Sequence, residues 1–298
     1  MHMAIKQIHN IPPRTALLVI ITVFLFEESR ALEGNFHVRY ESWVEKYKTS
    51  NDPPRYCKSC LELAENKARS FSYYSQMERD AVVLINLYTQ NMTDDKKIYK
   101  HLNSQLRSGH LTQLMREYKE LLGMSITMLS SKSRKCFNTV FRGTNCQTIG
   151  KGKQEHVFPE FLSTSTDVDI AFDFGFDGSA CKELIVIKNV MHKHGLFVEP
   201  YSDFPDEGEV LLKSSTKIRI TKYYDGKSDF NDKSRIKNVT THLGLSSDVQ
   251  VYVEGFVVDN KRRKKRSIAC LTNSSDTPHP YIQMCIMMIA ILMKFNIF

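Results

Sequence analysis

The sequence predicts an α+β fold in which a mainly helical region precedes a strand-rich region. Between residues 36 and 130, apolar side chains recur at steps of three and four, as in a helix that buries one face; they include Trp43, Val44, Leu61, Leu63, Val83, Leu84 and Leu87. From Thr139 onward the pattern changes to short runs of β-branched and aromatic residues, which favour strands. No Gly-x-Gly-x-x-Gly motif follows a strand, so the pattern does not indicate a Rossmann fold.

The expected elements follow one another along the chain. Pro53-Pro54 interrupts the helical region once, because proline lacks the amide hydrogen that a helix interior needs. The predicted strands are Thr139–Phe141, Phe161–Ser165, Leu184–Lys188, Glu209–Leu212, Ile218–Tyr224 and Val249–Val258. A chain of 298 residues with 42% hydrophobic residues has enough apolar material for one substantial core, and we expect one main domain over residues 31–260.

The positive charge of the chain is concentrated in one segment. The formal net charge is +8, and the run Lys261-Arg262-Arg263-Lys264-Lys265-Arg266 supplies six of these charges, which leaves +2 for the rest. The basicity is therefore local and does not indicate a nucleic-acid partner. The run lies in a linker over residues 261–280 and resembles a processing site for a subtilisin-like convertase; the alternative is a solvated loop that attracts acidic surfaces.

Both ends of the chain carry hydrophobic segments typical of sorting signals. An apolar stretch from Ala16 to Phe26 follows basic residues and predicts a signal peptide over residues 1–30. An uncleaved anchor is the alternative, although the stretch is shorter than the roughly 20 residues that span a bilayer. A hydrophobic tail over residues 281–298 follows small residues and a polar spacer, the order of a GPI-attachment signal. We expect a secreted protein or one attached to the outer face of the cell membrane.

The secretory pathway would permit N-glycans and disulfides. Asn91, Asn238 and Asn273 each begin an Asn-x-Ser/Thr acceptor triplet. Six of the seven cysteines would remain after removal of both terminal segments, and six can pair: Cys57, Cys60, Cys136, Cys146, Cys181 and Cys270. Their spacing alone does not give the connectivity. A zinc site on Cys57-x-x-Cys60 is a further alternative, but no second Cys-x-x-Cys or suitable histidine pair follows.

Three short motifs carry the residue types that a dinucleotide site needs. Arg142 precedes Gly143 at the end of a predicted strand, and the planar fork of donors on an arginine pairs with a pyrophosphate. Ser163 lies in the next predicted strand, where a short hydroxyl can bond a ribose or an amide. Glu207 and Glu209 lie two positions apart, so one carboxylate can hold a ribose hydroxyl while the other receives a cationic acceptor. Together the motifs indicate a site for NAD+.

In order and flanking residues, these motifs closely resemble the R-S-ExE signature of the arginine-specific ecto-ADP-ribosyltransferases. The similarity continues upstream in Leu87-Tyr88-Thr89 and in Tyr99-Lys100-His101-Leu102-Asn103, and it covers roughly residues 36–258. It departs at Glu160, where the family usually has glutamine, and after Leu212, where the family usually has an Ile-Pro-Pro segment. The resemblance implies that the strand-rich region is an NAD-binding core of the ADP-ribosyltransferase type.

The resemblance also implies roles for the motif residues. Arg142 would bind the phosphates of NAD+, Ser163 would position the nicotinamide ribose, and Glu209 would oppose the positive charge that develops as nicotinamide leaves. Glu207 would hold the acceptor guanidinium and assist its deprotonation. Further contacts with the dinucleotide are expected from Gly143, through close backbone approach, and from Tyr88, Ser202 and Phe176, the last of which is otherwise a core residue. The expected co-substrate is NAD+, and the related dinucleotide NADP+ is considered beside it. No metal is expected.

The leading functional prediction is an NAD+-protein-arginine mono-ADP-ribosyltransferase. Two alternatives are an NAD+ glycohydrolase, in which water replaces the acceptor, and a non-catalytic surface module on the same fold. The resemblance further implies one disulfide from Cys57 or Cys60 to Cys270 and a second one from Cys136. The usual partner of the second bridge is missing from residues 191–200, so Cys181 or Cys146 would take its place.

Overall fold

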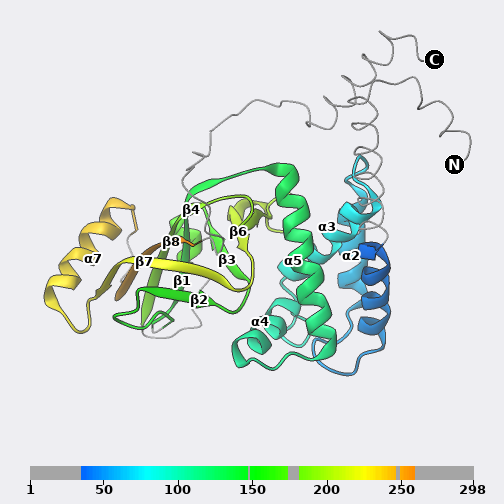
Figure 1. The fold of residues 1–298 in the computed structure, drawn as a ribbon, viewed down its shortest axis with the longest axis horizontal. Helices are drawn as coiled ribbons and strands as arrows, with labels where there is room; N and C mark the ends of the chain where they lie inside the picture. The colour runs from blue at the N-terminus through cyan, green and yellow to red at the C-terminus, as the bar shows by residue number, and fades with distance from the viewer. Residues whose placement is uncertain (1–34, 147, 174–180, 246–248, 259–298) are drawn as a thin grey trace, which may run out of the picture. The chain divides into compact units, whose positions relative to one another are not determined.

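A helical region precedes a mixed sheet in the computed structural model, which confirms the predicted α+β class (Figure 1). The structure describes residues 35–146, 148–173, 181–245 and 249–258. The predicted signal peptide (1–30), linker (261–280) and hydrophobic tail (281–298) lie outside the described residues. None of the helices within the described ranges is long and apolar enough to cross a lipid bilayer.

The helical region is built around one central helix. A helix over residues 35–49 is followed by α2 (Lys58–Arg69), α3 (Gln76–Thr89), α4 (Ile98–Ser108) and α5 (Gln113–Ser133). In α3, every residue from Asp80 to Tyr88 is buried, so this helix is surrounded by other elements. Its first turn carries a capping box, in which the backbone N–H groups and side chains of Ser75 and Glu78 hydrogen-bond reciprocally. The capping box fixes where α3 begins.

The strand-rich region forms an eight-stranded sheet within the described part of the chain, in the order β2-β7-β8-β4-β1-β3-β6-β5. Its strands are β1 (Phe137–Asn145), β2 (Glu155–Phe158), β3 (Leu162–Ser165), β4 (Lys182–Val190), β5 (Gly195–Phe197), β6 (Glu209–Leu212), β7 (Thr216–Asp225) and β8 (Val251–Val257). Neighbouring strands are antiparallel except for β4 and β8, which are parallel. All six predicted strands overlap strands of this sheet, whereas β2 and β5 were not predicted.

Strand β3 joins the segments that carry the three motifs. Ser165 pairs with Phe141 of β1 on one side and with Glu209 of β6 on the other. Side chains alternate along a strand, so Ser163 and Ser165 lie on the same face of β3. Of these two, Ser165 is the residue that pairs with Glu209 on β6. Segments that lie far apart in the sequence therefore become neighbours through the register of one short strand.

The helices cover the sheet at two places. Phe161, Leu196 and Leu211 of the strand-rich region join the hydrophobic cluster of the helical region, which also includes Leu84 and Leu87 of α3. A separate cluster packs α6 (Val168–Asp173) and α7 (Phe230–His242) against β4 and β8; it includes Phe172, Leu184, Val186, Ile236 and Tyr252. Figure 1 shows α7 beside β7 and β8, away from the helices of the N-terminal region. The segment that leads into β3 meets α3 and α4, because Tyr88 and Asn103 both donate hydrogen bonds to the Phe161 carbonyl.

The disulfides differ from the predicted ones. Cys57 pairs with Cys60, and Cys146 pairs with Cys181, while Cys136 is a free thiol. Cys57 is the N-cap of α2, which places its Cα 5.2 Å from that of Cys60. The predicted bridge from this pair to Cys270 is wrong because the two sulfurs already bond each other, and the same bond leaves no thiolates for the zinc alternative.

The second disulfide follows from strand register. Asn145 of β1 lies opposite Lys182 of β4, so the two adjoining cysteines face each other with Cα atoms 5.3 Å apart. The predicted bridge from Cys136 is wrong because both of its proposed partners, Cys146 and Cys181, are used in this bond. Two disulfides in the described part are typical of an oxidising compartment.

Candidate active site

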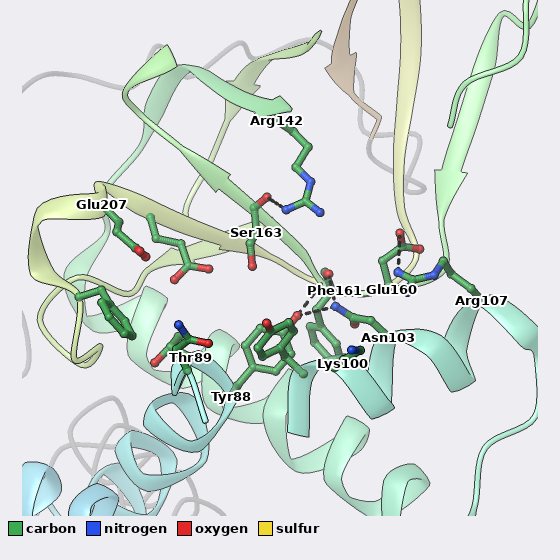
Figure 2. A pocket seen from close by; sticks show the side chains of 14 residues that line it. Tyr88, Thr89, Lys100, Asn103, Arg107, Arg142, Glu160, Phe161, Ser163 and Glu207 are labelled. Carbon is green, nitrogen blue, oxygen red and sulfur yellow. Dashed lines mark hydrogen bonds and ion pairs between the residues drawn. The ribbon is translucent and has the colours of Figure 1, made fainter. Parts of the chain in front are cut away.

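A cavity of about 360 Å³ lies between the helical region and the strand-rich region (Figure 2). This volume falls within the range of roughly 300–1,000 Å³ that is usual for small-molecule sites. Its lining comes from both regions: Tyr88, Thr89, Asn91, Tyr99, Lys100, Asn103 and Arg107 from the first, and Arg142, Glu160, Phe161, Ser163, Phe204, Glu207 and Glu209 from the second. The fold thus places all four predicted catalytic residues around one space.

Arg142 supplies a cation to this cavity. It lies on β1, and its Nη1 donates a hydrogen bond of 2.9 Å to the carbonyl oxygen of Ser163 on β3. Burial lowers the pKa of Arg142, and the nearby Tyr88, Glu160 and Glu209 raise it. The Nε atom is buried without a partner among the described residues. One edge of the guanidinium is therefore held by the protein, while other donors remain for a ligand.

Glu209 is the most buried carboxylate of the cavity. It is the first residue of β6 and is 5% exposed. The pKa of Glu209 is raised from its ordinary 4.5 to about 7: burial is the largest cause and Glu207 adds to the rise, while a hydrogen bond from Ser163 and the charge of Arg142 oppose it. At neutral pH this group is divided between its neutral and charged forms. A cationic ligand beside it would shift the balance toward the carboxylate.

Glu207 lies at the rim, in a turn that the sheet holds in place. It ends the 3₁₀ helix η2 (Pro205–Glu207) and is partly exposed, and burial raises the pKa of its carboxyl group. The hydroxyl of Ser165 donates to the Glu207 carbonyl at 2.7 Å, and the N–H of Thr166 donates to the Gly208 carbonyl at 3.0 Å. The two glutamates thus differ in depth: Glu209 lies inside and Glu207 at the entrance.

Gly208 is required between the two glutamates. Its φ is +55°, and a Cβ added there would lie 2.5 Å from Oγ1 of Thr166. We expect Gly208→Ala to cost about 1–2 kcal/mol from the left-handed backbone alone and to displace the loop, lowering kcat/KM. Gly152→Ala is the control, because Gly152 has φ +80° with nothing within 4 Å. Urea unfolding and NAD+ turnover measure both variants; equal stability losses with unchanged turnover would contradict the steric role of Gly208.

Tyr88 lines the cavity but bonds mainly to the protein. Its hydroxyl donates to the Phe161 carbonyl at 3.3 Å and accepts from Nδ2 of Asn103 at 2.9 Å. Asn103 Nδ2 also donates to the Phe161 carbonyl, at 3.2 Å. Burial raises the pKa of Tyr88 well above its usual range, so the hydroxyl stays protonated. The three residues connect α3 and α4 to the start of β3 and set the shape of this wall.

Three predicted cofactor contacts are not among the described residues that line the cavity. Gly143 and Ser202 are both buried and do not line the cavity, and Phe176 lies outside the described residues. A Cβ on Gly143 would lie 2.5 Å from the carbonyl oxygen of Ala171 in α6. The hydroxyl of Ser202 accepts from the N–H of Phe204 at 3.1 Å. The close approach expected at Gly143 is made by α6, and Ser202 supports the loop that leads to Glu207.

Replacing Gly143 separates packing from ligand binding. We expect Gly143→Ala to destabilise the fold by about 1–3 kcal/mol, as overpacking does, without a change in KM for NAD+ in the folded fraction. Gly123→Ala in α5 is the control: nothing lies within 4 Å of its added Cβ, and alanine favours a helix by up to about 1 kcal/mol. Chemical denaturation and steady-state kinetics measure these effects. A higher KM with unchanged stability would instead place Gly143 against the dinucleotide.

The α4 wall was not predicted as part of the site. Lys100, Asn103 and Arg107 recur at steps of three and four along α4, so they share one face of the helix. This polar stripe is the sequence feature that could have indicated the α4 wall. In the structure its residues line the cavity together with Glu160. Figure 2 shows Arg107 and Glu160 together at the end of the cavity opposite Glu207.

Unpaired polar atoms around the cavity indicate a polar ligand. Nε of Arg142, Oδ1 of Asn103 and Oε2 of Glu160 are buried without a hydrogen-bond partner in the described part of the protein. Buried polar atoms are nearly always satisfied in native proteins, so three such atoms in one cavity call for a partner. One cation and two acceptors fit a molecule that combines phosphates with hydroxyl groups. Among the described residues, no group of three or more His, Cys, Asp or Glu side chains forms a potential metal site.

Comparisons with known proteins identify a matching family model and a shared fold. A family model described as NAD:arginine ADP-ribosyltransferase matches residues 28–238, which is more than half of the chain. Comparison with curated protein sequences gives no significant match. The fold is similar to a mutant of the eukaryotic mono-ADP-ribosyltransferase ART2.2 in complex with NAD, at 15% identity and a TM-score of 0.52, covering 80% of this chain and 91% of that one.

A bacterial structure shows the same fold. The ADP-ribosyltransferase HopU1 of Pseudomonas syringae pv. Tomato DC3000 is 14% identical, with a TM-score of 0.50, and covers 76% of this chain and 97% of its own. At these identities the two solved structures speak for the fold alone. The structural similarity to these two proteins covers 80% and 76% of this chain.

Proposed function

The chain belongs to the NAD:arginine ADP-ribosyltransferase family, and from this membership we propose that it transfers ADP-ribose from NAD+ to arginine side chains of acceptor proteins and releases nicotinamide. The observation that carries the proposal is the meeting of Arg142, Ser163, Glu207 and Glu209 around one cavity. The solved relative in complex with NAD supports the choice of dinucleotide.

The chemistry of NAD+ explains why these residues suffice. Its nicotinamide is a cationic leaving group, so breaking the bond to ribose needs charge stabilisation and orientation more than an acid. Arg142 binds the phosphates through the donors that Ser163 leaves free. Glu209, in its charged form, accepts a hydrogen bond from a ribose hydroxyl and opposes the positive charge that develops on the ribose. Ser163 positions both Glu209 and the ribose.

Glu207 selects the acceptor in this proposal. Its carboxylate lies at the entrance, where a guanidinium from another protein can reach it. A bidentate pair with that guanidinium would orient one nitrogen toward the ribose. Since burial raises the pKa of Glu207, its carboxylate is also a better base than an exposed glutamate and assists removal of the guanidinium proton.

Labelled NAD+ tests the transfer directly. We expect the purified protein to attach label to an arginine-rich protein acceptor and to agmatine, and to release one nicotinamide for each ADP-ribose transferred. The protein-bound label should be released by neutral hydroxylamine. Resistance to hydroxylamine would rule out an arginine linkage. Release of free ADP-ribose without any adduct would show that the activity is that of an NAD+ glycohydrolase and not of a transferase.

We also propose that the protein works outside the cell or on its surface. The disulfides Cys57–Cys60 and Cys146–Cys181 support an oxidising compartment, and the acceptor residues Asn91 and Asn238 are exposed. Expression of the full chain in eukaryotic cells should give a glycosidase-sensitive protein in the medium or on the surface. Release from the surface by a GPI-specific phospholipase would identify the lipid anchor, and an unglycosylated cytosolic protein would overturn the proposal.

A further inference from the structure

Glu160 is a cavity residue that the proposed reaction leaves without a role. It precedes Phe161 at the start of β3, and its side chain is 13% exposed. Oε1 lies 3.5 Å from Nη1 of Arg107 on α4, while Oε2 is fully buried and has no partner among the described residues. A structural ion pair alone would not need to bury a second, unpaired oxygen, because leaving an acceptor unsatisfied is costly.

The backbone around Glu160 is held firmly. The carbonyl oxygen of the next residue, Phe161, accepts hydrogen bonds from Tyr88 and Asn103. These two bonds tie the backbone beside Glu160 to α3 and α4. Glu160 lines the cavity, and its ion pair with Arg107 and the burial of its side chain hold the carboxylate there.

The order of groups along the cavity gives Glu160 a partner. Figure 2 shows Glu207 at one end, Arg142 and Ser163 in the middle, and Glu160 with Arg107 at the other end. In the proposed function, on which this step rests, Ser163 faces the nicotinamide ribose and Arg142 faces the phosphates. The next group along the dinucleotide is the adenosine ribose, which carries two hydroxyl donors. It falls at the Glu160 end.

We propose that Glu160 accepts hydrogen bonds from the adenosine ribose hydroxyls and makes the protein select NAD+ over NADP+. A carboxylate pairs well with a ribose 2′-hydroxyl, whereas a 2′-phosphate at the same place meets a like charge. The phosphate carries a charge of about −1.5 to −2, so the repulsion in a partly buried site is strong. Arg107 holds the carboxylate in place; without Glu160 it would become free to bind the 2′-phosphate.

Glu160→Gln tests this selection. Glutamine keeps the shape and one acceptor but removes the charge. We expect calorimetry to show NAD+ binding weakened up to about tenfold, for the loss of one charged hydrogen bond, and NADP+ binding strengthened by about tenfold. The preference for NAD+ should fall by about a hundredfold in total. Adding Arg107→Gln to this variant should remove the gain for NADP+, because it removes the cation that would bind the 2′-phosphate.

Two further variants serve as controls. Glu155→Gln removes a partly exposed carboxylate of β2 that pairs with Lys217 and Arg219 and does not line the cavity, and it should leave the preference unchanged. Glu160→Asp keeps the charge and should continue to exclude NADP+. This variant provides the test of the inference if Glu160→Gln does not fold. A preference that stays within twofold in Glu160→Gln, or NADP+ binding by Glu160→Asp, overturns the inference.

Measurements of NAD+ and NADP+ binding distinguish failure of this inference from failure of the proposed function. If the protein binds NAD+ without transferring ADP-ribose, the transferase proposal fails, while the selection between dinucleotides is still measured. If the unmodified protein binds neither dinucleotide, both proposals fail together. If it binds NADP+ as tightly as NAD+, only the selection by Glu160 is wrong.

Discussion

Glu209→Gln should reduce NAD+ turnover by about a thousandfold while the protein remains folded, because it removes the preorganised charge that faces the reacting ribose. Glutamine keeps the size of the side chain and its place beside Ser163, so the cavity keeps its shape. Nicotinamide release measures turnover, and circular dichroism checks the fold. A residual rate within tenfold of the unmodified protein would show that Glu209 is not the group that opposes the developing charge.

The same substitution should stabilise the protein at alkaline pH. In the folded state burial raises the pKa of Glu209 from 4.5 to about 7, so the stability it contributes is fully present below pH 4.5 and is lost as the pH rises through about 7. A shift of this size corresponds to about 3 kcal/mol of unfolding free energy. Glu209→Gln removes this loss, and its melting temperature should exceed that of the unmodified protein at pH 8 but not at pH 4.

Glu254 provides a control of the opposite sign. It is 8% exposed; although burial raises its pKa, hydrogen bonds from Lys188, Tyr252 and Lys222 lower it below the ordinary value. A carboxylate with a lowered pKa stabilises the fold above its unfolded pKa, so Glu254→Gln should lower the melting temperature at pH 8. If both variants shifted the melting temperature in the same direction at pH 8, the pKa of Glu209 would not be raised as described.

The pH dependence of the unmodified enzyme follows from the same group. Only the charged form of Glu209 opposes the positive charge, so kcat/KM should rise about tenfold per pH unit below pH 7 and then level off. In the complex, the cationic nicotinamide favours the carboxylate, and kcat should level off at a lower pH. A flat profile between pH 5 and pH 8 would contradict the raised pKa.

The motif strands could be predicted because their signals are local. Arg142, Ser163 and Glu209 each lie in a β-branched or apolar run, and the order of the three motifs carries the family resemblance. Their meeting point could not be derived from any one segment, since it depends on Ser165 pairing with both Phe141 and Glu209. The resemblance supplied this non-local information.

Features that depend on long-range neighbours were the hardest to predict. The disulfide Cys146–Cys181, which the prediction missed, depends on the register of β1 against β4, and the close neighbour of Gly143 is α6, a six-residue helix with a weak sequence signal. Both features depend on which elements become neighbours, which periodicity does not reveal. The stripe formed by Lys100, Asn103 and Arg107 was visible in the sequence, but only the fold shows that it faces the cavity.

Glu207→Gln should separate transfer from NAD+ cleavage. We expect transfer to agmatine to fall by about a hundredfold, as for the loss of one general base, while hydrolysis of NAD+ changes only a few-fold. Glu207 is partly exposed at the rim, whereas the buried Glu209 lies beside Ser163, so the charge that promotes cleavage remains. Chromatography of free ADP-ribose and ADP-ribosyl-agmatine from one reaction measures both products. Equal losses of the two products would assign Glu207 to cleavage instead of acceptor binding.

The pH profile gives this variant a second readout that a damaged loop would not reproduce. Because the charge of Glu207 raises the pKa of Glu209, Glu207→Gln should move the midpoint of the hydrolysis profile from about 7 toward lower pH. Asp206→Asn is the matched control, since Asp206 is an exposed carboxylate of the same 3₁₀ helix that does not line the cavity. It should retain both the transfer rate and the midpoint. If both variants move the midpoint equally, the effect belongs to net charge on the loop and not to the neighbouring carboxylate inside the cavity.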